Sequence, residues 1–171
     1  VLVLGFETFY IAIKAGSGEL SHFNNSDRFH LNMFALMGFA ITLMTLWTAY
    51  IGWLFFSKKL PDLPRSYLWG IRMGIIMFVI FAIQGGMMGN NMAHTVGGPD
   101  GGAGLPLVNW STVYGDLRIS HFLGMHALQV IPLAGFYLIK SVRGIIMFGA
   151  AYFILTCLIL FQALMGEPLL G

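Results

Sequence analysis

Charge is scarce in this chain. Only 9% of its 171 residues are Asp, Glu, Lys or Arg, while 57% are hydrophobic and the mean hydropathy is +0.79. Soluble domains carry about 25% charged residues, so the composition excludes an ordinary soluble protein. The single cysteine, Cys157, excludes a disulfide within the chain. A net charge of +2 leaves no basic surface for nucleic acid, so no nucleic-acid partner is expected.

Long apolar runs take the place of the missing charge. A helix needs about 20 mostly apolar residues to cross the roughly 30 Å hydrocarbon layer. Four runs reach that length, and a shorter fifth run is counted as a span because Glu7 and aromatic residues in its middle are unlike a signal peptide. The expected spans are residues 1–15, 30–56, 67–89, 119–139 and 144–165. The sequence therefore predicts one domain, residues 1–171, that is an all-α polytopic membrane bundle with about five transmembrane helices and lipid around it.

Lysine and arginine are unevenly distributed between the two sides of this bundle. Six of them belong to the expected connections on one side, namely Lys58, Lys59, Arg65, Arg72, Lys140 and Arg143. Short cytoplasmic loops are enriched in these residues. The pattern predicts a cytoplasmic N-terminus and an opposite, extracytoplasmic face for the other ends of the spans.

One long outer loop, residues 95–115, is rich in glycine and proline, which favour tight turns over helix. Its apolar and aromatic side chains predict a folded lid over the outer end of the bundle. Trp110 and Tyr114 fit either a lining role or an anchor at the membrane interface. Asp116 is well placed to cap the helix that follows.

All five histidines are expected at the outer ends of the spans: His22, His30, His94, His121 and His126. Amide and acidic residues complete a polar layer in the outer half: Gln84, Asn91, Gln129, Gln162 and Glu167. Imidazoles ligate heme iron, copper and zinc, and polar groups inside a membrane are commonly functional. The layer predicts a metal, heme or proton site on this side.

A heme b with two histidine ligands would join His30 or His94 to His121 or His126 across facing helices. Arg118 would then lie near the propionates, and Gly85, Gly86, Gly89 and Gly124 would make room for the macrocycle. His121 and His126 are the preferred ligands, but about 140° of helix rotation separates them, so they would serve different partners. Copper or another metal, held by the same histidines, is an alternative, and so is a purely structural role without cofactor. No catalytic residue is assigned.

A signature in the second half of the chain resembles an uncharacterised family of bacterial multi-pass membrane proteins. It consists of GPDGGAGLP at 98–106, NWS at 109–111, GDLR at 115–118 and HFLGMHALQ at 121–129. The resemblance implies a bacterial inner-membrane protein and no particular activity. A looser similarity links the histidine-bearing bundle to membrane b-type cytochromes, which commonly carry heme ligands toward both faces, whereas this chain carries none inside.

Three functions remain open on the sequence. The leading hypothesis is a heme or metal pocket for electron transfer or quinol chemistry, in a subunit of a larger complex and with quinone as a partner. The second is an accessory or assembly subunit that docks a membrane-protein partner through the outer loop. A transporter or channel is third, because the inner half of the spans is nearly all apolar.

Overall fold

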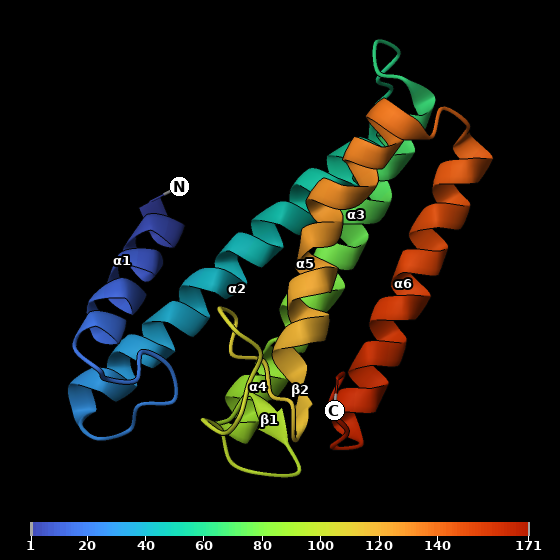
Figure 1. Ribbon diagram of the computed structural model, residues 1–171. Coiled ribbons are helices and arrows are strands. Elements are labelled where there is room, and N and C mark those ends of the chain that lie inside the picture. Colours follow the sequence, from blue (N-terminus) through green and yellow to red (C-terminus); the bar gives the residue numbers. More distant parts are fainter. Residues whose placement is uncertain (1, 171) are drawn as a thin grey trace. The chain divides into compact units, whose positions relative to one another are not determined.

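The computed structural model describes residues 2–170, and in that range the chain is mainly helical (Figure 1). The helices are α1 (Leu2–Gly16), α2 (Arg28–Ser57), α3 (Arg65–Gln84), α4 (Gly86–Asn91), α5 (Leu117–Leu133) and α6 (Val142–Leu164), with a π-helical turn, η1 (Ala134–Leu138), and two strands, β1 (Thr95–Val96) and β2 (Gly115–Asp116). The chain divides into two compact units, Val1–Trp47 and Thr48–Gly171, with the boundary inside α2.

Within residues 2–170, four helical segments are long and apolar enough to cross a membrane: Arg28–Ser57, Arg65–Asn91, Leu117–Leu138 and Val142–Leu164. They confirm the all-α bundle and correct the expected count of five spans. The first expected span corresponds to α1, which has 15 residues. At 1.5 Å per residue this helix extends about 22 Å, short of the roughly 30 Å hydrocarbon layer.

Glycines bring α3 and α5 together in the second unit. A Cβ atom at Gly74 would lie 2.8 Å from the carbonyl oxygen of Ala127, and one at Gly70 would lie 2.9 Å from that of Ile131. The two backbones therefore approach as closely as the missing side chains allow. The core of this unit consists of Met77, Phe81, Ala127, Ile131, Ala134 and Ile145, on α3, α5, η1 and α6.

Two of the four spans are irregular. Arg65–Asn91 has a small interruption at Gly85, the single residue between α3 and α4, which keeps helical dihedral angles (φ −55°, ψ −27°) and whose amide is shared between the carbonyls of Phe81 and Ala82. Leu117–Leu138 passes from α5 into η1, where the amide of Ile139 bonds to the carbonyl of Ala134 five residues earlier at 2.7 Å. π-helical turns such as η1 are frequent at functional sites.

Within the first unit, α1 and the start of α2 are linked by polar side chains. The ammonium of Lys14 lies 2.6 Å from Glu19 and 2.8 Å from Nε2 of His30. Nδ1 of the same imidazole lies 2.8 Å from Asp27. Both ring nitrogens of His30 are thus engaged by neighbouring side chains.

Candidate functional site

The outer loop of the second unit is closed at its base by β1 and β2, which pair antiparallel with Thr95 opposite Asp116. Asp100 fixes the first half of the loop. Its carboxylate accepts hydrogen bonds from the amides of His94 and Thr95 and from the Thr95 hydroxyl, at 2.7 to 3.0 Å. Burial opposes ionisation of this carboxyl group, but these bonds outweigh it, so the pKa of Asp100 lies below its ordinary value of 3.8.

Asp116 fixes the second half. Its side chain is fully buried and forms a two-point ion pair with Arg118, at 2.9 Å to Nε and 2.6 Å to a terminal nitrogen. It also accepts from the amides of Ser111 and Arg118, so it caps α5 as the sequence predicted. Arg118 donates to the carbonyl of Asn109 as well. The guanidinium is therefore a structural brace of the loop rather than a group held ready for heme propionates.

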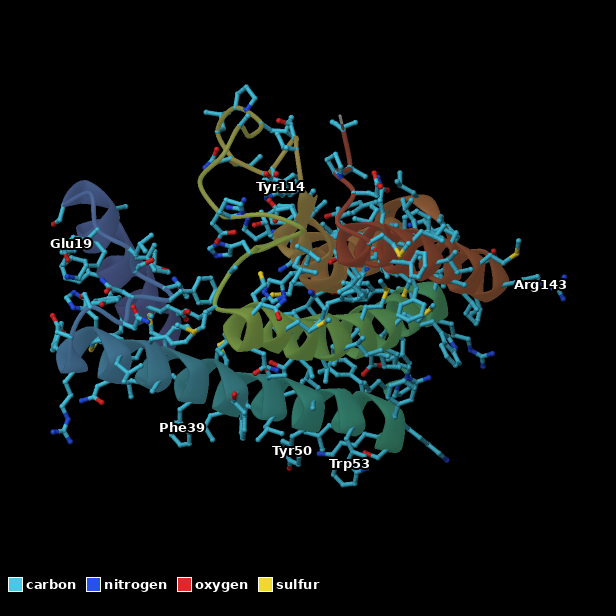
Figure 2. The ribbon with its side chains drawn as sticks, turned by 90° about the horizontal axis from the view of Figure 1, so that it is seen from below. Glu19, Phe39, Tyr50, Trp53, Tyr114 and Arg143 are labelled. Carbon is cyan, nitrogen blue, oxygen red and sulfur yellow. The ribbon has the colours of Figure 1, made fainter. Side chains whose placement is uncertain are left out.

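The tip of the loop turns back along α5, as Figure 1 shows. Trp110 packs edge-on against Phe122 of α5, with ring centroids 5.5 Å apart. Leu107 at the tip is fully exposed and has a positive φ of 71°. Tyr114 packs into the space over Gly98, where a Cβ atom would lie 2.2 Å from the ring; Figure 2 labels Tyr114 beside the loop. The loop is thus a folded segment, but Leu107, Val108 and Val113 are exposed and do not pack on the bundle.

His121 lies where α5 meets the interruption of the Arg65–Asn91 span. Its Nδ1 is 2.7 Å from the carbonyl oxygen of Phe81 on α3. A carbonyl only accepts, so Nδ1 carries the hydrogen and Nε2 carries the lone pair of the neutral ring. A Cβ atom at Gly85 would lie 2.6 Å from Cε1 of this imidazole. The Cε1–Nδ1 edge of the ring therefore lies over Gly85, and the ring as a whole is partly exposed.

Gln84, the last residue of α3, is only 7% exposed, and neither its amide oxygen nor its amide nitrogen has a hydrogen-bond partner within residues 2–170. It lies three residues after Phe81, and therefore on the same side of α3 as the core. A buried amide without partners costs free energy. Gln84 and His121 are thus the two polar groups that the structure brings to the interruption at Gly85.

The other predicted histidines lie in different settings. Nδ1 of His126 bonds to the carbonyl of Phe122 on its own helix, and its ring lies 3.9 Å from the Phe122 ring on the exposed side of α5. Nδ1 of His94 lies 2.8 Å from Asp100 in the loop. His30 belongs to the first unit, as does His22, whose Nε2 lies 4.0 Å from Glu7. The histidines of the second unit therefore do not share one ligand-binding geometry.

The remaining predicted polar residues are also dispersed. Asn91 and Gln129 are exposed, and the side-chain amide of Gln162 donates to the carbonyl of Pro168 at 2.6 Å. Glu167 is exposed near the C-terminus of the bundle and lines a small hollow with Gln162. These residues stabilise chain ends or face outward, so the polar layer is not one continuous pocket.

Two of the four glycines expected to make room for a macrocycle are covered by side chains of the protein. A Cβ atom at Gly124 would lie 2.0 Å from the Phe81 ring, and the space over Gly85 is taken by the His121 ring, whereas the space over Gly86 is open. In the described part of the chain, no three His, Cys, Asp or Glu side chains are grouped so that they could hold a metal ion. The structure thus leaves one oriented, partly exposed imidazole next to Gly85.

Sequence reasoning missed the interruption at Gly85 and the carbonyl of Phe81 that orients His121. The signal for the interruption was present as two consecutive glycines within an apolar run. The fold defines a helical protein with four apolar helices of membrane-spanning length. Comparison with family models, with curated proteins and with solved structures finds no match to this chain.

Proposed function

We propose that this chain is an integral membrane protein of electron transfer that binds a quinol at His121, in the extracytoplasmic half of its helix bundle. A quinol is a lipid-soluble carrier whose ring bears hydroxyl groups. The observation that carries the proposal is the 2.7 Å bond from His121 Nδ1 to the Phe81 carbonyl. It fixes the imidazole and makes Nε2 an acceptor, which is the group that a hydroxyl donor needs.

The surroundings of His121 suit a ligand that arrives from the bilayer. His121 is partly exposed, and the space over Gly86, next to the glycine that the ring covers, is open. A planar ring can therefore lie on backbone there without meeting a side chain. Because the helices leave no gap between them at Gly85 and Gly124, the ligand occupies the flank of the bundle. Access from the flank is the route open to a carrier that diffuses in lipid.

The test is quinone content and quinol binding in matched histidine variants. Wild-type protein and the His126→Ala variant are expected to retain quinone after purification in mild detergent, measured by extraction and chromatography. His121→Ala is expected to lose it, and to bind a short-chain quinol about fivefold more weakly by calorimetry, because a hydrogen bond is worth about 1 kcal/mol. Equal binding by the two variants would contradict the proposal.

A heme or other metal cofactor is the second candidate, and the same observation favours it. A histidine that ligates a metal almost always donates its other ring nitrogen to a carbonyl or carboxylate, as His121 does. Such a heme would lie on the flank of α3 and α5, with His121 as its ligand. Purified protein without a Soret band and without stoichiometric iron or copper would rule it out and leave the quinol proposal intact.

A further inference from the structure

At the opposite end of the second unit, the connection between α2 and α3 encloses an open groove of about 450 Å³. Four cationic side chains line it: Lys58, Lys59, Arg65 and Arg72. Its other lining residues are largely apolar and come from the end of α2, the connection and the first turn of α3: Phe56, Ser57, Leu60, Pro61, Leu63 and Leu68. We call these ten residues the basic groove.

The charges of the basic groove are not balanced within it. Asp62, the carboxylate of the connection, is exposed and does not line the groove. Arg72 is held in place, because its Nε donates to the carbonyl of Phe55 at 2.9 Å and its guanidinium lies 5.1 Å from the Phe56 ring and 5.2 Å from the Trp69 ring. A fixed guanidinium beside three further cations is a binding surface for an anion.

The apolar part of the lining favours a phospholipid over a free phosphate as the bound anion. A free phosphate needs no hydrophobic contacts, whereas the phosphate of a phospholipid is attached to glycerol and acyl chains. The groove lies where α2 ends and α3 begins, at the same end of the unit as the connection between η1 and α6 (Figure 1). If the chain spans the membrane as proposed above, this end is at the level of the lipid headgroups.

We infer that the basic groove binds the headgroup of an anionic phospholipid, with its phosphate among Lys58, Lys59, Arg65 and Arg72 and its glycerol and upper acyl chains on the apolar residues. The inference rests on the membrane placement but not on the quinol site. Loss of lipid binding would leave quinol binding at His121 unaffected, so the two proposals fail separately.

The experiment is lipid titration of the purified full chain in detergent, followed by native mass spectrometry. Phosphatidylglycerol, phosphatidylcholine and inorganic phosphate are the three probes. The test variant is Lys58→Gln/Lys59→Gln. The matched control is Lys140→Gln/Arg143→Gln, which removes the same charge from the same end of the unit but outside the groove (Figure 2 shows Arg143 pointing away).

Phosphatidylglycerol is expected to bind wild-type protein and the control variant with similar affinity, and the test variant about tenfold or more weakly, because each cation near a lipid headgroup is worth roughly fivefold. If phosphatidylglycerol binding is weakened equally in both variants, the lipid is attracted by the positive charge of this end in general. That result would overturn the assignment of the site to the basic groove. Equal binding of phosphatidylcholine, or binding of inorganic phosphate alone, would overturn the anionic-lipid assignment.

Discussion

The contact between Gly124 and Phe81 sets how closely α5 approaches α3, so Gly124→Ala is a direct test of the packing. The added Cβ would lie 2.0 Å from Cγ of Phe81, against an ordinary carbon contact of about 3.5–4.0 Å. The ring would have to retreat by roughly 1.5 Å. Phe81 is 1% exposed, and its ring centroid lies 6.1 Å from that of Phe153. The ring is therefore enclosed and cannot move without displacing its neighbours.

Overpacking of this kind costs about 1–3 kcal/mol, and alanine returns up to about 1 kcal/mol of helix propensity. The expected net loss is about 1–2 kcal/mol, and the melting temperature followed by circular dichroism in detergent should fall by about 2–8 °C. Gly86→Ala is the control, because no atom lies within 4 Å of its Cβ position, and it should melt at or above the wild-type temperature.

Adding Phe81→Leu to Gly124→Ala should recover part of the loss, because the smaller side chain leaves room for the new methyl group. A Gly124→Ala protein as stable as wild type would show that the helices can separate there at no cost. The Phe81 ring would then not block the gap between α3 and α5 at Gly124, and a macrocycle could no longer be excluded from that gap.

Three further predictions concern the buried amide and the loop. Gln84→Met should raise the melting temperature, since it removes an unpartnered buried amide that costs about 1–3 kcal/mol; a lower melting temperature would show that the amide is satisfied. Asp116→Ala should cost about 3 kcal/mol, because it breaks a buried ion pair, and should speed hydrogen exchange across residues 95–115; unchanged exchange would contradict the bracing role. The pKa of Asp100 is lowered in the folded loop, so its stabilisation is present at higher pH and is lost as pH falls below 3.8. Protection of the Thr95 amide, corrected for intrinsic exchange, should therefore persist from neutral pH to the ordinary aspartate range, and Asp100→Asn should reduce it already at neutral pH.

The long helices were predictable because length and apolar composition alone specify them. The expected span 30–56 is observed as Arg28–Ser57, and 144–165 as Val142–Leu164. The cap at Asp116 was also predictable, because it depends on one side chain next to its own helix. The first span failed because α1 is short in the described residues.

The candidate site was harder to predict, because it depends on contacts between helices. Periodicity places His121 and His126 at the outer end of one helix, but it does not show which imidazole meets a carbonyl of α3. That outcome depends on Gly74 and Gly124, which set the distance between the two backbones. The glycines were expected to leave space for a ligand. At Gly124 and Gly85 that space is occupied by the rings of Phe81 and His121.

The π turn at Ala134–Leu138 has a bearing on how this bundle tolerates changes in length. A wide turn accommodates one residue more than an α-helical turn, so it is a place where the chain carries an insertion without disturbing what comes before it. Removing one residue there should restore a regular helix and rotate the start of the following connection by about 100°. The contacts of Gly124 upstream would keep their alignment, and the side chains from the deletion through Lys140 would change direction.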